Sequence, residues 1–204
     1  MRTFMDTYPK SKYKDEANGL MVKIYMSSKN YGEALKSLES IGTLTSDLKM
    51  AYQQIAYYRG PELFNNLEYQ AAIYMLDKSM EYGIYDRTIN SYCTYWKAES
   101  NYKLNKYAEA QKLFKDYIVM QGAFGTQEYE RSHYNIAYTY FEEEAYSSAA
   151  MWFRKYVDMA KDKKSDIYTD ALIRTGDSYY MLKDFSMAVK YYDQAVKIGR
   201  FDVE

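Results

Sequence analysis

Apolar residues recur along this chain at three- and four-residue spacing, the period of amphipathic helices, and the pattern itself repeats. Each block contains an aromatic residue followed three positions later by alanine. These pairs are Tyr31 and Ala34, Tyr69 and Ala72, Tyr107 and Ala110, Tyr146 and Ala149, and Phe185 and Ala188, with the aromatic positions 38, 38, 39 and 39 residues apart. The spacing predicts five structural repeats, because self-similarity at a fixed period is the signature of a repeat architecture.

Two further positions recur in every block. Four residues after the alanine stands a large residue, which is Leu38, Leu76, Phe114, Phe153 or Tyr192. Twelve residues before the alanine stands a residue that is small in four of the five blocks: Val22, Gly60, Ala98, Ala137 or Gly176. A small residue on one helix and a large one on the next allow two helices to approach closely, so each block is expected to hold a helical pair.

We name the two helices of each pair helix A and helix B, in chain order. Helix A is expected at about 13–28, 47–66, 88–104, 127–144 and 166–182, and helix B at about 31–41, 69–82, 107–120, 146–160 and 185–198. Ser46, Thr126 and Ser165 are the expected N-cap residues. Neither helix can bury its apolar face alone, so the pairs must stack into an all-α solenoid.

This register divides the chain, as a single array over 1–204, into repeats at about 11–44, 45–84, 85–122, 123–162 and 163–200, with 1–9 closing a truncated preceding repeat at Pro9. The last helix B finishes near Ile198, and no polar capping helix follows it. Arrays normally need such caps for solubility. We therefore expect either a piece of a longer array or ends, including Val196, that associate with something else.

Composition supports long helices and excludes several kinds of partner. The chain has only 2 prolines and 9 glycines, and its 27 tyrosines suit a thin fold in which many residues are half-buried. The 27 basic and 28 acidic residues leave a net charge of −1, so no nucleic-acid partner is expected. No run of 18 apolar residues occurs, so no direct membrane insertion is expected.

Candidate chemical residues are few. His133 is the only histidine and Cys93 the only cysteine, whereas zinc sites and Ser–His or Cys–His catalysis need several such residues. We expect both side chains to pack between helices. The segment 122–125 contains two glycines but matches no phosphate-binding loop and is expected to be a turn. No catalytic residue, no metal site and no cofactor is therefore expected.

The segments 98–110 and 175–180, followed by Phe185, Ala188 and Ala195, resemble the tetratricopeptide-repeat family. The resemblance covers almost the whole chain and implies a right-handed superhelix of antiparallel helix pairs, which binds other proteins and catalyses nothing. Two features depart from the family pattern: the period exceeds the usual length of about 34 residues, and the repeat-ending proline occurs only at Pro9.

Residues 8–17 are similar to repeats of bacterial cell-envelope proteins, among them outer-membrane assembly lipoproteins and periplasmic cell-division coordinators. This second resemblance implies a periplasmic or outer-membrane-associated protein. A cytoplasmic location is the alternative, because the N-terminus carries no long apolar stretch typical of a signal peptide.

In the tetratricopeptide family the A helices line a concave surface on which partners often lie. The family's contact positions carry over here to Tyr57, Phe64, Tyr95, Trp96, Tyr102, Arg131, Tyr134, Asn135, Tyr138, Phe141, Arg174 and Tyr180. Tyrosine, tryptophan and arginine are enriched in binding hot spots. The alternative interpretation is that these rings fill the interior of a narrow superhelix and meet no partner.

One family specificity can be tested residue by residue. The carboxylate clamp that grips chaperone C-termini needs five basic or amide residues, and its places hold Tyr95, Glu99, Asn135, Asp170 and Arg174. Only two of the five fit, so this specificity is excluded. Two hypotheses remain: a scaffold that binds a partner protein or peptide along the concave face, and a self-associating structural array whose ends stack within a larger envelope assembly.

Overall fold

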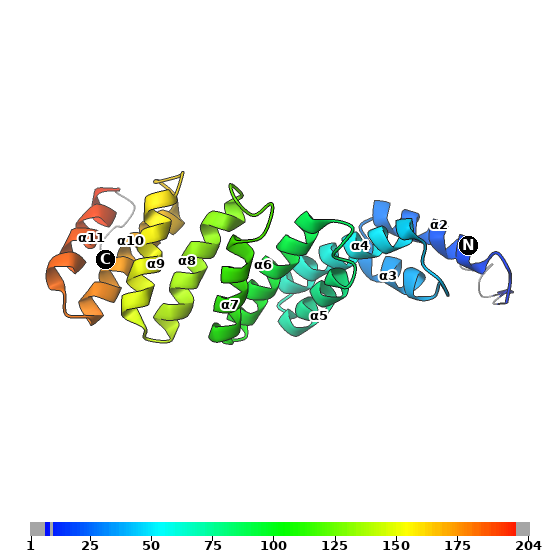
Figure 1. The fold of residues 1–204 in the computed structure, drawn as a ribbon, viewed down its shortest axis with the longest axis horizontal. Helices are drawn as coiled ribbons and strands as arrows, with labels where there is room; N and C mark the ends of the chain where they lie inside the picture. Colours follow the sequence, from blue (N-terminus) through cyan, green and yellow to red (C-terminus); the bar gives the residue numbers. More distant parts are fainter. Residues whose placement is uncertain (1–6, 9, 199–204) are drawn as a thin grey trace. The chain divides into compact units, whose positions relative to one another are not determined.

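The computed structural model describes residues 7–8 and 10–198, and within them the chain forms ten α-helices and no strand (Figure 1). The helices are α2 (Lys14–Ser27), α3 (Tyr31–Glu39), α4 (Ser46–Asn65), α5 (Tyr69–Met80), α6 (Arg87–Lys103), α7 (Tyr107–Ile118), α8 (Gln127–Glu142), α9 (Tyr146–Met159), α10 (Asp166–Met181) and α11 (Phe185–Lys197). The expected all-α solenoid of helix pairs is confirmed, whereas the repeat end expected at 1–9 lies largely outside the described residues, Pro9 included.

The helix ends agree with the expected bounds to within about two residues. Thr126 and Ser165 are N-caps as expected, and their hydroxyls accept hydrogen bonds from the backbone N–H groups of Tyr129 and Tyr168. The expectation for Ser46 is wrong by one position, because Thr45 caps α4 and Ser46 is its first helical residue. Both residues carry a hydroxyl, so composition alone does not separate them.

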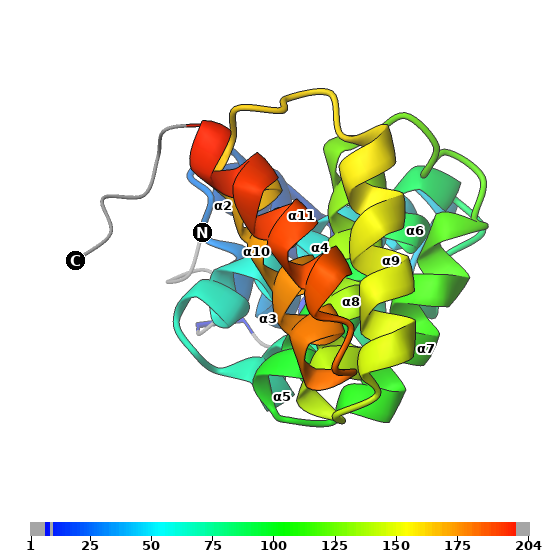
Figure 2. The ribbon, with the colours of Figure 1, turned by 90° about the vertical axis from the view of Figure 1, so that its left-hand side faces the viewer.

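The chain divides into two compact units, one running to Ser100 and the other from Asn101 onward, so that α6 contributes to both. In the first unit α3 packs against α2 and α4, and α4 packs against α5. In the second unit α8, α9, α10 and α11 pack in sequence, and α7 packs against α8 (Figures 1 and 2). Each unit is therefore a stack of helices in which every element contacts its neighbours in the chain.

The five repeated alanines are all buried, as expected from their positions in the repeat. The small position of helix A provides the matching surface. A Cβ atom built on Gly60 would lie 2.5 Å from Cδ2 of Leu76, and one built on Gly176 would lie 2.5 Å from Cε1 of Tyr192. Helices A and B of these two repeats therefore approach so closely that a methyl group at either glycine would displace the side chain of Leu76 or Tyr192.

The turn from helix A to helix B has the same backbone geometry in every repeat. One residue in each turn has a left-handed conformation, with φ between 56° and 65°: Lys29, Leu67, Asn105, Glu144 and Lys183. The next N–H then reaches back to the carbonyl five residues earlier, as from Glu68 to Leu63 at 2.9 Å. This arrangement ends helix A by satisfying its last carbonyl groups, although none of the five residues is glycine.

Replacing Gly60 with alanine tests the close approach of α4 and α5. The added methyl group would collide with Leu76, and overpacking of this kind lowers the free energy of unfolding by about 1–3 kcal/mol. Gly19→Ala is the matched control, because nothing lies within 4 Å of that position in α2 and the better helix propensity of alanine should stabilise the chain by about 0.5–1 kcal/mol. Chemical denaturation measures both; equal stabilisation by the two variants would contradict the close approach.

Candidate functional site

The residues expected to contact a partner lie on the A helices, and each unit is described by itself. In the first unit, Phe64 of α4 lies edge-on to Trp96 of α6, with ring centroids 5.2 Å apart. The ring of Tyr57 lies 6.2 Å from that of Tyr92, again joining α4 to α6. The side chains of Tyr57, Phe64 and Trp96 are half-buried, so each is held by a neighbour and still has an accessible part.

Tyr95 was expected to lie on this surface, but the structure buries it. Its side chain is only 2% exposed. The ring packs edge-on against Trp96 at 5.6 Å, and its hydroxyl donates a hydrogen bond to Oε1 of Glu99, one helical turn away, at 2.6 Å. Tyr95 therefore supports the surface from inside and does not form part of it.

In the second unit, the rings of α8 converge on one buried side chain. Phe153 of α9 is fully buried, and the ring centroids of Tyr138, Tyr134 and Phe141 lie 5.1, 5.9 and 6.4 Å from its own. Such edge-on contacts stabilise aromatic pairs beyond the area that they bury. The three α8 rings are half-buried, because one part contacts Phe153 and another remains accessible.

A polar network joins these rings to α10. Oδ2 of Asp170 accepts hydrogen bonds from the hydroxyls of Tyr134 at 2.8 Å and Tyr138 at 2.5 Å. Nε of Arg174 donates to the hydroxyl of Tyr138 at 3.1 Å, and its Nη1 pairs with Oδ2 of Asp177 at 2.8 Å. The guanidinium carbon also lies 5.8 Å from the ring centroid of Phe141. The network fixes both tyrosine rings and the arginine in one arrangement.

Burial and nearby charge affect the protonation of the two tyrosines and the arginine in this network. Burial raises the pKa of Tyr134, and the negative charge of Asp170 raises it further, so the phenol stays protonated and can donate. Burial and the hydrogen bond to Asp170 raise the pKa of Tyr138 as well. Desolvation lowers the pKa of Arg174, but the hydrogen bond with Tyr138 and the charges of Asp170 and Asp177 outweigh this effect and raise it.

The remaining residues of the expected set differ in their surroundings. The ring of Tyr102 packs against Tyr107 at 5.5 Å, while Arg131 lines a cavity of about 110 Å³ together with Tyr156, and Asn135 is half-buried on α8. Tyr180 is the most accessible member, with 57% of its surface exposed and its ring edge-on to Phe185 at 5.5 Å.

Sequence reasoning missed the part that Asp170 and Tyr192 play in the network. Asp170 served there only to exclude a carboxylate clamp, and Tyr192 was expected only to pack between helices. In the structure the hydroxyl of Tyr192 donates to Oδ1 of Asp177 at 2.8 Å, and burial together with that hydrogen bond raises the pKa of Tyr192 to about 12. The spacing of Asp170, Arg174 and Asp177 by four and three residues was the available signal, because it places all three on one face of a helix.

The two residues first considered for chemistry are both interior. His133 is buried between Tyr129 and Trp152, and its Nδ1 lies 2.9 Å from the carbonyl oxygen of Tyr129, so the neutral ring donates a hydrogen bond there. Cys93 is fully buried, and burial raises the pKa of its thiol to about 11. Both side chains therefore serve packing in this structure.

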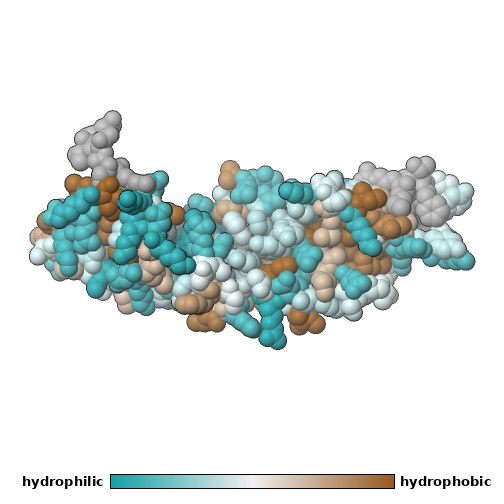
Figure 3. Space-filling view, turned by 90° about the horizontal axis from the view of Figure 1, so that it is seen from above, coloured by the Kyte–Doolittle hydropathy of each residue, from teal (hydrophilic) through white to brown (hydrophobic). Residues whose placement is uncertain are grey.

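The described part of the chain holds neither a candidate metal site nor a candidate membrane-spanning helix. Among residues 7–8 and 10–198, no group of three His, Cys, Asp or Glu side chains is placed to hold a metal ion. No helix in the same residues combines the length and the apolar character needed to cross a bilayer. In space-filling representation, hydrophobic residues form separate patches among hydrophilic ones on the face shown in Figure 3.

Comparison with known families identifies two of the repeats. Residues 130–163 and 170–198 each match a model of the tetratricopeptide repeat. The first segment covers most of α8 and all of α9, and the second covers most of α10 and all of α11. A search among curated protein sequences found no match. The matches support a tetratricopeptide-repeat protein, and this class of scaffold generally mediates protein–protein interaction.

Solved structures show the same fold at low sequence identity. MamA from Desulfovibrio magneticus RS-1 (residues 41 to the end) superimposes with a TM-score of 0.62 at 16% identity, covering 94% of this chain and 98% of that one. YrrB, a tetratricopeptide-repeat protein with an unusual peptide-binding site, gives 0.64 at 15%, covering 96% and 91%. BtubC from P. vanneervenii gives 0.65 at 12%, covering 93% and 82%. At these identities the likeness establishes the fold alone.

The buried His133 predicts a component of acid sensitivity. Burial lowers the pKa of the imidazole, and the nearby positive charge of Lys155 lowers it further, although the hydrogen bond to Tyr129 acts in the opposite direction. The imidazole of the unfolded chain, whose pKa is about 6.5, therefore binds a proton at a higher pH than the imidazole of the folded chain. The free energy of unfolding is thus highest above pH about 6.5 and falls as the pH falls through the lower pKa of the folded state. The free energy of unfolding should fall less steeply between pH about 7 and 5 in His133→Phe than in the parent. Parallel curves in urea titrations would contradict the assignment.

Proposed function

We propose that this chain is a non-catalytic scaffold that binds a partner peptide or protein through the helix A face of its second unit. We define this face by Tyr134, Tyr138, Phe141, Arg174 and Tyr180. The observation that carries the proposal is that four of these side chains are held by contacts within the unit while part of each remains accessible. Aromatic and arginine side chains of this kind dominate the affinity of many interfaces.

Preorganisation is the physical advantage of the arrangement. Ordering a free side chain on binding costs about 0.5–1.5 kcal/mol. Tyr134, Tyr138 and Arg174 are already ordered by Asp170 and by the rings around Phe153, so a partner would not have to supply that free energy. Their accessible parts offer ring faces for apolar side chains, and the exposed hydroxyl-bearing ring of Tyr180 adds a further contact.

Two similarities are compatible with the proposal. YrrB has the same fold and is described as having a peptide-binding site, so this arrangement of helices can hold a peptide in at least one other protein. The likeness of residues 8–17 to envelope proteins supports a place in the bacterial cell envelope as part of the same proposal.

Tyr180 offers a direct test because its truncation leaves the interior network intact. A photoreactive phenylalanine analogue at this position, introduced in cells, should cross-link a partner that mass spectrometry identifies. Tyr180→Ala should then weaken the purified complex about tenfold, or ~1.4 kcal/mol. Tyr74→Ala is the matched control, because this tyrosine on α5, a B helix, is 56% exposed against 57% for Tyr180.

Isothermal titration calorimetry would provide both dissociation constants. Equal losses from Tyr180→Ala and Tyr74→Ala would place the binding outside the helix A face and would refute the proposal. A partner that cross-links equally from position 180 and position 74 would also refute the proposal.

A second candidate function, self-association of the chain, is favoured by the outer side of α11. Val189 and Val196 are 57% and 62% exposed, and Phe185 is exposed beside them. Their equivalents 39 residues earlier include Ala150 and Val157, which are buried in α9 where α10 packs against it. The side of α11 that matches a buried helix interface is therefore apolar and exposed, and another copy of the chain could cover it.

Introducing a charge on α11 tests this second function. Val196→Glu should lower the self-association constant of the 204-residue chain at least tenfold in sedimentation equilibrium, because a carboxylate would have to be desolvated in the contact. Val119→Glu is the control, since Val119 lies in the same unit, 82% exposed, between α7 and α8. A parent chain that remains monomeric at millimolar concentration would eliminate self-association as a function.

A further inference from the structure

The first repeat lacks a side chain that the other four repeats carry. Three residues before the small position of helix A stand Tyr57, Tyr95, Tyr134 and Ile173 in repeats two to five. The equivalent residue in repeat one is Gly19. Apart from its two chain neighbours and the backbone of its own helix, nothing lies within 4 Å of the place where its Cβ would stand, so side chains from other helices do not fill this space.

Tyr134 shows what a large residue does at this position. Its ring lies 5.4 Å from Tyr156 on helix B of the same repeat, and its hydroxyl bonds Asp170 on the next helix A. The ring thus occupies the space between its own helix B and the following helix A. In repeat one the residue equivalent to Tyr156 is Ile41, seven positions after the repeated alanine; its side chain is 7% exposed, and Gly19 stands at the position equivalent to Tyr134.

A groove of about 490 Å³ occupies this place in the first unit. Its size lies in the range of ligand-binding pockets. Gly19 and Leu20 of α2 form one apolar side, and Ile41 and Leu48 form the other. The complete lining is Asp15, Glu16, Gly19, Leu20, Lys23, Ile41, Thr43, Thr45, Asp47 and Leu48.

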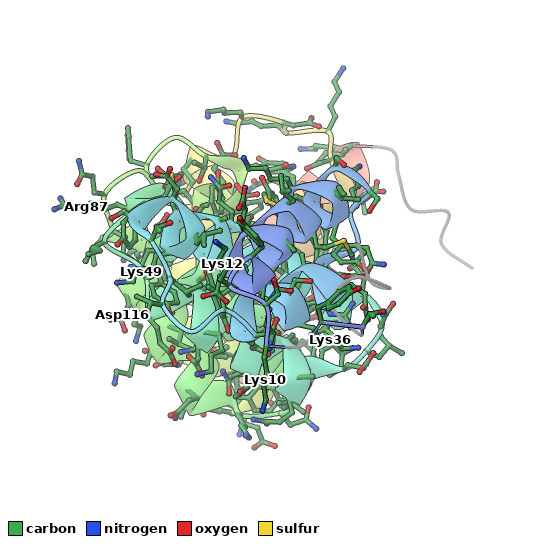
Figure 4. The ribbon with its side chains drawn as sticks, turned by 90° about the vertical axis from the view of Figure 1, so that its right-hand side faces the viewer. Lys10, Lys12, Lys36, Lys49, Arg87 and Asp116 are labelled. Carbon is green, nitrogen blue, oxygen red and sulfur yellow. The ribbon has the colours of Figure 1, made fainter. Side chains whose placement is uncertain are left out.

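The rim of the groove is acidic. Asp15, Glu16 and Asp47 are exposed, and none of them forms an ion pair with any other residue of the described chain. Lys23 is the single basic residue in the lining. Lys12, which lies beside the start of α2 in Figure 4, is not part of the lining. Its ammonium group lies 5.0 Å from the ring centroid of Tyr13. Three carboxylates against one ammonium group therefore favour a cationic ligand.

We infer that this groove binds a short segment of a partner protein in which an aromatic side chain stands next to lysine or arginine. The aromatic ring occupies the space that Gly19 leaves open and contacts Leu20, Ile41 and Leu48. The neighbouring cation pairs with the acidic rim. The inference rests on the proposed function, since it names the chemistry of a partner, but it concerns a different surface from the helix A face of the second unit.

The first experiment selects ligands from random sequences, so that the partner need not be identified beforehand. A phage-displayed library of random seven-residue peptides is enriched on the immobilised 204-residue chain, and the winning peptides are synthesised with a fluorophore. Fluorescence anisotropy then measures their dissociation constants. We expect the enriched sequences to place Phe, Tyr or Trp beside Lys or Arg. Enrichment of acidic peptides, or no enrichment, would overturn the inference.

Gly19→Tyr is the decisive variant, because it restores the residue type found in three of the other repeats and fills the groove. It should weaken binding of the selected peptides at least tenfold, while circular dichroism and thermal unfolding report an intact fold. Gly32→Tyr is the matched control: Gly32 lies on α3 of the same unit and also has nothing within 4 Å of its Cβ position. It should leave the dissociation constant within about twofold.

Charge is tested separately from shape. Asp47→Asn in the protein, or lysine to glutamate in the peptide, should weaken binding several-fold and reduce its dependence on salt, because the ion pair is exposed to screening. Peptides that bind Gly19→Tyr as well as the parent but fail on Tyr180→Ala would refute this inference and leave the proposed function standing. Peptides whose binding depends on Gly19, together with a natural partner unaffected by Tyr180→Ala, would support this inference and refute the proposed function.

Discussion

Close contact between a small residue on helix A and a large residue on helix B determines how each repeat is built. Gly60 against Leu76 and Gly176 against Tyr192 show the distance involved, because even one added methyl group would force the facing side chain to shift. The repeated alanines of helix B are buried in all five repeats, although the large residue changes from leucine to phenylalanine to tyrosine. The fold therefore depends on a volume relation between two helices and tolerates several side chains that satisfy it.

The helix A faces follow from this contact. Once Phe153 is buried beneath α8, the rings of Tyr134 and Tyr138 can rest on it edge-on and turn their hydroxyls toward Asp170. Packing of the repeat thus positions the groups that are proposed to meet a partner. In the first repeat the corresponding position holds Gly19, so the same framework leaves a groove where the other repeats have a side chain.

Periodicity was sufficient to predict the helices, the buried alanines and the N-caps at Thr126 and Ser165, because these depend on residues close together in the sequence. It could not predict that Tyr95 is buried, since family contact positions assume that the side chain points outward. The role of Asp170 was also missed, because two tyrosines on another helix reach it and their orientation depends on packing. Repeat spacing predicts which residues lie on the same face of a helix, but which side chains contact each other across two helices depends on the folded structure.

The five left-handed turn residues have a consequence for how the repeats can be recognised. Lys29, Leu67, Asn105, Glu144 and Lys183 share one backbone geometry although their side chains are of four different types, and the same main-chain hydrogen bond recurs in each turn. The turn therefore accepts several kinds of side chain at this position. Repeats of this kind can keep the spacing of their helices while the residues of the motif differ. This is consistent with family models, which compare residues, matching two of the five repeats.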